Sequence, residues 1–203
     1  MIAIIDSGGA NIASVRFALE RLGVDGQLTA DPAVIAAAER VILPGVGAAP
    51  AAMAQLDRAG LVGCIRGLTQ PVLGICLGMQ LLFERSEEGN TPLLGLISGT
   101  CRAFDPAGGL TVPHMGWNRL VPAGEAAHPL LDGVAAGSHV YFVHSYAAPV
   151  LENTVASCSY GVDFTALVAR GNFMGAQFHP ERSGPVGAAI LGNFLKLPAG
   201  AKG

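Results

Sequence analysis

The sequence predicts an α/β fold with three layers, α/β/α, in which the central sheet is mostly parallel and gains some antiparallel strands in the C-terminal half. Hydrophobic residues make up 51% of the 203 residues and charged residues only 13%, a composition typical of a parallel sheet covered by helices on both faces. In the first half, short apolar runs also alternate with helical segments, as in a parallel sheet with crossover helices.

The first half of the chain supplies the parallel part of this sheet. Three short apolar runs are predicted to be buried strands: residues 2–6, 40–43 and 72–75. A first helix is expected from Asn11, as its N-cap, through Leu22, because apolar residues recur there at helical spacing. A second helix starts at Asp31-Pro32, where proline tolerates the first turn. A third is expected over residues 77–85, directly after Cys76.

The second half has a different pattern, with strands joined by short connections. Four strands are predicted, some of them antiparallel, at residues 140–143, 154–158, 164–169 and 173–178. A last helix is expected over residues 187–195 and is stopped by Leu197-Pro198. The length suits one domain, so we expect a single domain over residues 1–198 and a frayed tail over 199–203.

Charge and composition exclude several classes of partner. The net charge is −3 with a pI near 5.9, which does not fit the basic surface of a nucleic-acid-binding protein. The longest uncharged stretches are too short and too interrupted to span a bilayer, so a cytoplasmic protein is expected. In a reducing compartment the four cysteines, Cys64, Cys76, Cys101 and Cys158, are expected to be free thiols.

Cys76 stands out because of its surroundings. In Gly74-Ile75-Cys76-Leu77-Gly78, a predicted strand runs into a helix with glycine two residues away on either side. This pattern indicates a nucleophile elbow, in which a sharp turn exposes the sulfur near a helix N-terminus that favours an anion. The Leu77 N–H can then face an oxyanion. The alternative, an inert buried cysteine in a glycine-rich turn, is equally compatible with these five residues.

Two further segments complete a candidate site. Gln177-Phe178-His179-Pro180-Glu181 follows a predicted strand, and residues two apart in an extended segment point the same way, which places His179 as base and Glu181 as its orienting carboxylate. Pro44-Gly45-Val46-Gly47 ends another strand and suits a second oxyanion donor. Read singly, the first segment is better explained as a surface His-Pro turn and the second as a simple tight turn. Together they lie at the C-terminal ends of sheet strands, where open α/β sheets keep their sites.

The motifs Gly-Ile-Cys-Leu-Gly-Met-Gln and Phe-His-Pro-Glu, in this order, resemble those of the class I (triad) glutamine amidotransferases over nearly the whole chain. The resemblance implies that Cys76 is the nucleophile, with His179 and Glu181 as its partners and Val46 and Leu77 as oxyanion donors. It also implies that glutamine is bound by Gly47, Gln80, Glu88, Ser145 and Tyr146. No cofactor is implied, and no metal.

Other segments narrow the resemblance to the glutaminase subunits of imidazole glycerol phosphate synthases in histidine biosynthesis. They are Asp6-Ser7-Gly8-Gly9-Ala10-Asn11, Pro113-His114-Met115-Gly116-Trp117-Asn118 and Tyr141-Phe142-Val143-His144-Ser145-Tyr146. This resemblance implies that the chain is one subunit of a heterodimer and that it delivers ammonia to the other subunit, a (β/α)₈-barrel cyclase. The resemblance places Asn11, Trp117, Tyr141 and Arg182 near the cyclase. For Trp117, a position in the hydrophobic core is the alternative. After Tyr146, Ala147 stands where a second aromatic residue is common.

Two rival interpretations remain at this point. One is a glutaminase subunit of another pathway, of the anthranilate or aminodeoxychorismate synthase type, which Met79 and the Pro-His-Met-Gly-Trp segment disfavour. The other is a non-catalytic binding module that kept the fold, although the three catalytic residues are present. His114, His128, His139 and His144 are interpreted as structural or interface residues and not as metal ligands, because His139 and His144 should face opposite sides of a strand.

Overall fold

The structure is a computed structural model that describes residues 1–6, 12–124 and 128–199. Within these residues the main sheet has eight strands in the order β2-β1-β3-β4-β14-β13-β12-β9. Their bounds are β1 (Ile2–Ile5), β2 (Gly26–Thr29), β3 (Arg40–Gly45), β4 (Val72–Cys76), β9 (Val121–Pro122), β12 (Thr154–Tyr160), β13 (Val162–Arg170) and β14 (Phe173–Ala176). The first five in sheet order are parallel and the rest antiparallel, as predicted.

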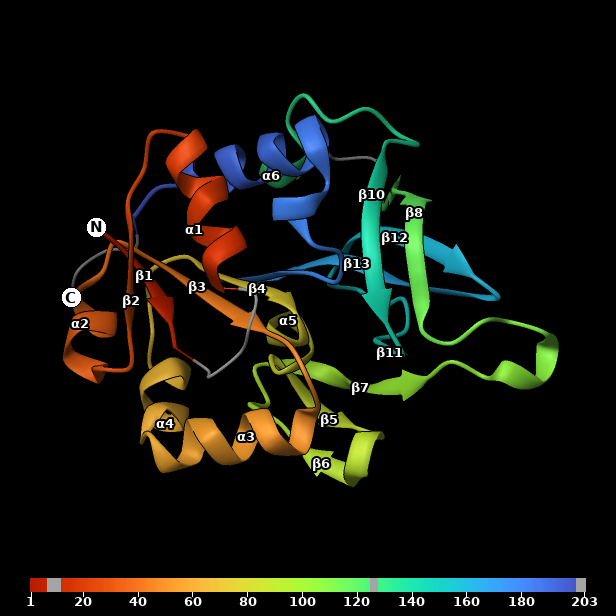
Figure 1. The fold of residues 1–203 in the computed structure, drawn as a ribbon, viewed down its shortest axis with the longest axis horizontal. Helices are drawn as coiled ribbons and strands as arrows, with labels where there is room; N and C mark the ends of the chain where they lie inside the picture. The colour runs from red at the N-terminus through yellow and green to blue at the C-terminus, as the bar shows by residue number, and fades with distance from the viewer. Residues whose placement is uncertain (7–11, 125–127, 200–203) are drawn as a thin grey trace.

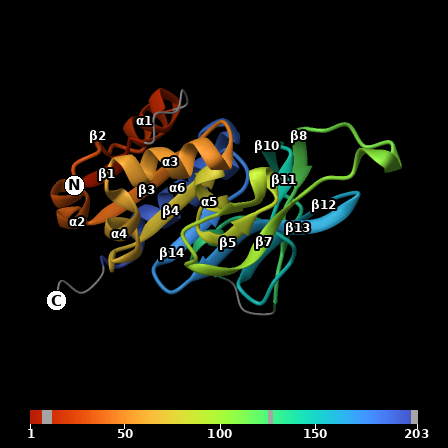
Figure 2. The ribbon, with the colours of Figure 1, turned by 90° about the horizontal axis from the view of Figure 1, so that it is seen from below.

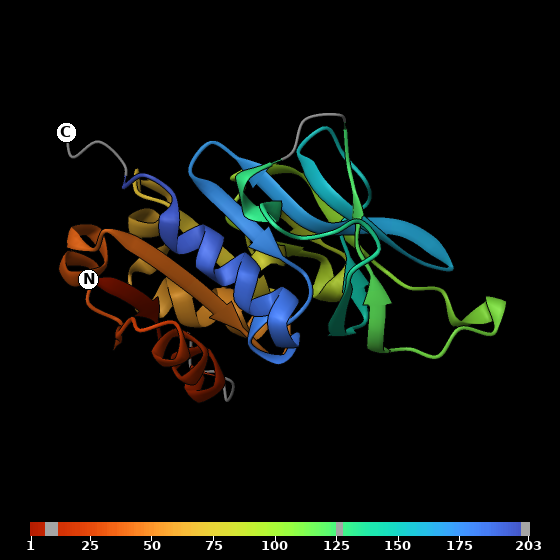
Figure 3. The same ribbon diagram turned by 90° about the horizontal axis from the view of Figure 1, so that it is seen from above.

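Helices cover both faces of the parallel part (Figure 1). Helices α1 (Ile12–Arg21) and α6 (Gly184–Lys196) lie on one face (Figure 3), and α2 (Pro32–Ala37), α3 (Ala49–Arg58) and α4 (Leu61–Arg66) cover the other (Figure 2). The strands explain this division, because Ile2 and Ile4 pack with α1 and α6 while Ala3 and Ile5 pack with α2, α3 and α4. Alternate residues of a buried strand thus supply both cores, and the three-layer prediction is confirmed.

Two smaller sheets extend the C-terminal half. One pairs β10 (His139–His144) with β8 (His114–Arg119) in antiparallel register. The other has the order β11-β7-β5-β6, with bounds β5 (Phe83–Ser86), β6 (Thr91–Pro92), β7 (Ile97–Ala103) and β11 (Tyr146–Ala147). Four short 3₁₀ helices complete the described elements: η1 (Glu88–Asn90), η2 (Pro106–Gly108), η3 (Pro129–Leu131) and η4 (Pro180–Arg182).

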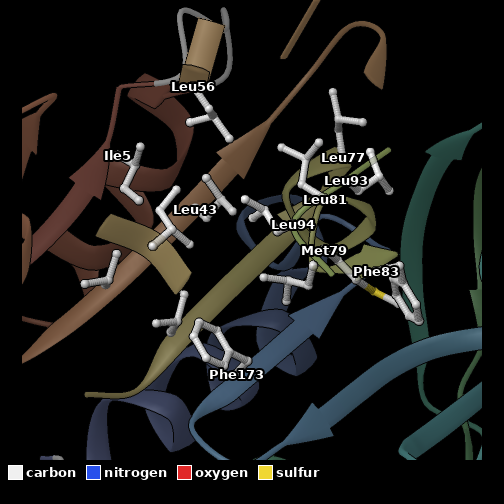
Figure 4. Packing of buried hydrophobic residues seen from close by; sticks show 14 of the residues in the cluster. Ile5, Leu43, Leu56, Leu77, Met79, Leu81, Phe83, Leu93, Leu94 and Phe173 are labelled. Carbon is white, nitrogen blue, oxygen red and sulfur yellow. The ribbon is translucent and has the colours of Figure 1, made fainter. Parts of the chain in front are cut away.

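The prediction of a helix over residues 77–85 is wrong beyond its first turn. Helix α5 spans only Leu77–Gln80, and Phe83–Ser86 is strand β5, which pairs with β6 and β7. The apolar residues after Cys76 are buried whichever side they face, so their pattern carries no helical period. Figure 4 shows three of them, Leu77, Met79 and Leu81, in the core with Leu43, Phe83 and Phe173.

The remaining differences concern element ends, two helices, and the strands β2, β6, β7, β8, β9 and β11, none of which was predicted. Helix α6 begins three residues before the predicted position 187 and ends at Lys196, with Leu197 as its C-cap. Asp31 caps α2 by accepting from the Ala33 N–H at 2.8 Å, as expected. The predicted cap Asn11 and the tail residues 200–203 lie outside the described residues. Helices α3 and α4 were not predicted: alanine supplies four of the ten residues of α3, and α4 has only six residues, too few to show a helical period.

Candidate active site

Cys76 occupies a strained turn between β4 and α5. Its φ is 54° and its ψ is −112°, a backbone conformation that non-glycine residues rarely adopt and that costs on the order of 1–3 kcal/mol. Such strain persists only where the surrounding structure enforces it. The side chain ends up next to β10, with Sγ 3.7 Å from the Val143 carbonyl oxygen. The sharp strand-to-helix turn predicted for Cys76 is present.

Close backbone approaches enforce this turn. A Cβ added to Gly78 would lie 1.8 Å from the Leu43 carbonyl oxygen on β3, and one added to Gly74 would lie 2.5 Å from the Gly78 carbonyl oxygen. Gly45 is equally confined, because its Cβ would lie 2.5 Å from the Gly78 backbone nitrogen. Glycine therefore lets α5 start directly on top of the ends of β3 and β4.

His179 and Glu181 form the second part of the site. The His179 Nδ1 lies 2.8 Å from Glu181 Oε1, and both side chains are nearly excluded from solvent, with 5% and 0% exposed. The expected pairing is present, but the expected extended segment is not, because Pro180–Arg182 form the 3₁₀ helix η4. Proline suits the first position of such a turn, and the tight turn brings Glu181 back beneath the imidazole.

The electrostatics couple His179 to both neighbours. Burial alone would lower the pKa of the His179 imidazole, but hydrogen bonds to Cys76 and Glu181, together with the charges of both groups, raise that pKa to about 10. The imidazole therefore carries a proton beside the Cys76 sulfur. The arrangement suits a sulfur nucleophile with a neighbouring proton donor.

The register of the sheet explains why these residues meet. Strands β3, β4 and β14 are adjacent, with Gly45 paired to Cys76, and Pro44 and Ala176 both paired to Ile75. The three motifs therefore leave the same edge of the sheet at the same level. They open on a cavity of ≈ 570 Å³ lined by Val46, Gly47, Cys76, Leu77, Gln80, Glu88, Pro113, Val143, His144, Ser145, Tyr146, His179 and Arg182.

Every residue expected to bind glutamine or to stabilise an oxyanion lines this cavity. Gln80 is held from α5 by a 2.7 Å hydrogen bond from its Nε2 to the Tyr146 carbonyl oxygen. Glu88 accepts a 2.7 Å hydrogen bond from the Ala49 N–H at the start of α3. Gly47 adopts a positive φ of 90°, which brings the chain after β3 across the cavity wall. The structure thus brings these predicted residues together without itself assigning their roles.

The residues expected at the cyclase interface are partly accessible. Trp117 is 57% exposed on β8, so the core alternative for this tryptophan is wrong. Its ring meets the Tyr141 ring edge-on at 6.0 Å between centroids, and the Arg182 guanidinium lies 5.9 Å from the centre of the Tyr141 ring. Arg182 also lines the cavity, so this aromatic group borders the cavity mouth. Asn11 lies outside the described residues.

Three buried polar residues near the site were not predicted to contribute. Ser183 accepts from the Tyr141 N–H at 2.9 Å and donates to the His179 carbonyl oxygen at 2.7 Å, which ties η4 to β10. His144, which lines the cavity, and Gln177, which lies behind it, are also buried. Gln177 stood within the quoted Gln-Phe-His-Pro-Glu segment, but only long-range contacts reveal its role. Nothing in the local sequence distinguishes Ser183 from a surface residue, and His144 was interpreted only as a structural or interface residue.

The other histidines and cysteines have structural surroundings. His114 and His144 face each other in the core, His128 caps η3, and His139 is exposed at the opposite end of β10. Among the residues described, no group of three or more His, Cys, Asp or Glu side chains could hold a metal ion. All four cysteines are free thiols. In the described part of the chain, no helix has the length and apolar character needed to cross a membrane.

The fold and the cysteine elbow correspond to a known family. The family model for glutamine amidotransferase class-I matches residues 3–197. The chain therefore belongs to the class-I glutamine amidotransferases. Two solved structures share the fold, a glutamine amidotransferase (TM-score 0.72, 18% identity, 96% of each chain) and PurLQS from Thermotoga maritima (TM-score 0.70, 21% identity, 96% of each chain).

Curated relatives define the branch of that family. The chain is 58% identical over 196 residues to the imidazole glycerol phosphate synthase subunit HisH of Xanthomonas euvesicatoria pv. vesicatoria (strain 85-10), covering 97% of each protein. It is 56% identical over 198 residues to the HisH subunit of Xylella fastidiosa (strain Temecula1), covering 98% of each. These relatives favour the resemblance to imidazole glycerol phosphate synthases over the anthranilate synthase type.

Proposed function

We propose that this chain is the glutaminase subunit of an imidazole glycerol phosphate synthase and that it hydrolyses glutamine to glutamate and ammonia. The observation that carries the proposal is the strained Cys76 elbow, which shares one cavity with the His179–Glu181 pair. Residues 1–198 act as one amidotransferase domain in this proposal, consistent with the family match over residues 3–197.

The reaction begins with attack of the Cys76 sulfur on the side-chain amide carbon of glutamine. The carbonyl oxygen becomes an oxyanion, which the backbone N–H groups of Leu77 and Val46 stabilise. His179 gives its proton to the departing nitrogen, so the carbon–nitrogen bond breaks and ammonia leaves, with a thioester remaining on Cys76. His179 then takes a proton from water, which attacks the thioester and releases glutamate with the restored thiol.

The cavity residues supply glutamine recognition in this proposal. Glu88 binds the α-ammonium group of glutamine, because its carboxylate borders the cavity while one oxygen is already fixed by Ala49. Gln80 and the backbone of Gly47, Ser145 and Tyr146 form the remaining wall. Glu181 stays hydrogen-bonded to His179 and keeps the imidazole oriented toward Cys76.

The ammonia has a defined destination in the proposal. A (β/α)₈-barrel cyclase docks over the cavity as the second subunit of a heterodimer and receives ammonia before water protonates it. The cyclase then forms imidazole glycerol phosphate and aminoimidazole carboxamide ribonucleotide, which gives the complete enzyme a lyase activity. The four free thiols fit a reducing cytoplasm. No nucleic acid or membrane takes part.

An assay of ammonia release tests the proposal. Cys76→Ala should lower glutamine hydrolysis by roughly 10⁴-fold or more, because no other group can form the thioester. The cyclase should still work with added ammonium, since its own site is unchanged. The matched control Cys64→Ala alters a half-buried thiol outside the cavity and should stay within a few-fold. Hydrolysis retained by Cys76→Ala excludes the mechanism, and no hydrolysis by the intact complex supports a non-catalytic module.

A further inference from the structure

A buried amide lies directly behind the cavity. Gln177 is fully buried in the segment that leaves β14, and its backbone N–H is fixed by a 2.9 Å hydrogen bond to the Ala166 carbonyl oxygen. Its side chain has two neighbours from the candidate site. The Oε1 lies 2.9 Å from Gln80 Nε2, and the Nε2 lies 3.9 Å from Cys76 Sγ.

The orientation of Gln80 follows from one carbonyl group. The Tyr146 carbonyl oxygen can only accept a hydrogen bond, so Gln80 must present its Nε2 to it, at 2.7 Å. The second N–H of that nitrogen then points to Gln177 Oε1, at 2.9 Å. With both amide hydrogens used, Gln80 has its Oε1 as the polar atom left for the cavity.

A chain of hydrogen bonds through two histidines ends at the same Tyr146 carbonyl group. Because the Tyr146 carbonyl accepts, the His144 Nδ1 at 2.8 Å carries a proton. A neutral His144 then accepts at Nε2 from the His114 Nδ1, 3.0 Å away, and His114 accepts at Nε2 from Asn118 Nδ2, 3.3 Å away. Burial lowers the pKa of both imidazoles, which keeps them neutral. The direction of each hydrogen bond in the chain from Asn118 through the two histidines to the Tyr146 carbonyl group is therefore fixed.

The same logic fixes the end of Gln177 that faces sulfur. Its Oε1 accepts from Gln80, so its Nε2 is the end directed at Cys76 Sγ. An N–H group near a sulfur atom interacts better with a thiolate than with a thiol, because the anion is the stronger acceptor. Gln177 directly follows β14, and His179 lies two residues further on, at the start of η4.

We propose that Gln177 serves the glutaminase reaction in two ways: it holds the Gln80 amide with its oxygen toward glutamine, and it donates an N–H to the Cys76 sulfur. The inference rests on the proposed function, since it concerns glutamine as the substrate. Gln80 is the group that touches glutamine, and Gln177 positions it from the protein side. Toward Cys76, Gln177 acts on the reacting atom itself.

Two substitutions separate these roles. Gln177→Glu keeps an acceptor for Gln80 but removes the N–H that faces sulfur and adds negative charge. Gln177→Met has similar size and removes both interactions. The pH dependence of Cys76 alkylation by iodoacetamide is measured in the full chain, with modification of the Cys76 peptide followed by mass spectrometry. Glutamine binding is measured in the same samples as the concentration that halves the alkylation rate.

Gln177→Glu should move the alkylation profile of Cys76 upward by about one pH unit or more, because the thiolate loses a donor and gains a nearby anion. The protective glutamine concentration should stay within about threefold. Gln177→Met should shift the profile and also raise the protective concentration roughly tenfold, as expected when a buried amide loses its partner. The control Asn193→Leu removes a buried amide with two backbone acceptors outside the cavity and should change only the melting temperature.

Several results would overturn the inference. An unshifted profile in Gln177→Glu excludes the donor role, and unchanged glutamine protection in folded Gln177→Met excludes the positioning role. If Gln177→Met does not fold, Gln177→Ser tests the same loss with a smaller polar side chain that cannot reach Gln80. Glutamine that fails to protect the unmodified chain speaks against the proposed function, whereas the comparison of alkylation profiles still tests the contact with sulfur.

Discussion

At the scale of single residues, the Cys76–His179–Glu181 arrangement resembles a hydrolase triad with two differences. Its nucleophile is a thiol, which ionises more easily than a hydroxyl, and the raised pKa of His179 keeps the imidazole protonated at neutral pH. A protonated His179 cannot act as a base toward the sulfur before attack. Its main task in the proposed reaction is to deliver a proton to the leaving nitrogen.

This division of labour predicts unequal losses. His179→Ala removes the proton donor and should nearly abolish glutamine turnover. Glu181→Gln leaves a hydrogen-bonding group beside Nδ1 and should lower turnover by only ~10–10³-fold, because a thiol needs less activation than a hydroxyl. Steady-state ammonia release from the complex measures both. A larger loss in Glu181→Gln than in His179→Ala means that the two roles are reversed.

The chemistry of Cys76, His179 and Glu181 could be read from two short segments at strand ends. The residues expected to bind glutamine, Gln80 among them, were implied by the family resemblance. Gln177 and Ser183 were missed as contributors, since the contacts that link them to Tyr141, Gln80 and Cys76 join residues 42 to 101 positions apart. Such contacts depend on the register between strands, which no local pattern specifies.

At the scale of elements, the junction of β4 and α5 depends on glycine. Gly78→Ala should be severely destabilising, because its Cβ would lie 1.8 Å from the Leu43 carbonyl oxygen of β3 and neither backbone can move without disturbing the sheet. We expect a loss of roughly 3 kcal/mol or more in the free energy of unfolding. Urea denaturation at pH 7 measures this loss.

A second glycine provides the control for this prediction. Gly192 lies within α6, and a Cβ there meets nothing within 4 Å. Gly192→Ala should therefore stabilise the protein by about 0.5–1 kcal/mol through helix propensity and reduced chain entropy. If Gly78→Ala unfolds at the same urea concentration as the unmodified protein, the close approach of α5 to β3 is not present in solution.

The pair of strands β8 and β10 carries a buried histidine pair that should make the fold sensitive to acid. Burial lowers the pKa of His114 to about 4 and that of His144 to about 3. Below the usual value of about 6.5, the unfolded chain binds protons that the folded chain excludes. Each imidazole thus removes stability as pH falls toward its folded pKa, by roughly 1.4 kcal/mol per pH unit.

His144→Gln tests this at element scale, because an amide can still donate to Tyr146 and accept from His114. The variant should lose stability less steeply than the unmodified protein between pH 6.5 and 4.5, as measured by urea denaturation at each pH. His179 contributes little slope there, since its raised pKa leaves it protonated in both states. The control His139→Gln changes an exposed residue on the same strand and should keep the original slope. An unchanged slope in His144→Gln contradicts the prediction.

At the scale of the whole molecule, the three-layer architecture was predictable because buried parallel strands have a distinct composition. The alternation of Ile2, Ala3, Ile4 and Ile5 between two cores is what a continuous apolar run requires. The smaller sheet of β5, β6, β7 and β11 was not predictable. Three of its four strands have only two to four residues. The parallel pairing of Phe83 with Ile97 and the antiparallel pairing of Ala147 with Arg102 depend on the tertiary fold.

The position of Trp117 connects this architecture to the proposed partner. Trp117 is 57% exposed and has an edge-on contact with Tyr141, while Arg182 reaches from the Tyr141 ring to the cavity. A large aromatic side chain next to a site that releases ammonia is costly to leave in water and suits the centre of a protein interface. A cyclase docked here would cover both the aromatic residues and the cavity mouth.

Trp117→Ala should therefore weaken binding of the cyclase by roughly 10–100-fold, a magnitude typical of an aromatic residue at the centre of an interface. The melting temperature of the free chain should change little, because the ring is mostly exposed. Titration calorimetry and thermal denaturation measure the two effects. Leu28→Ala is the matched control, since Leu28 is 40% exposed on β2, an edge strand of the main sheet on the side of the molecule away from β8 (Figure 1), and should leave affinity unchanged. A large fall in melting temperature with unchanged affinity in Trp117→Ala would show that the ring stabilises β8 and β10 and does not contact the partner.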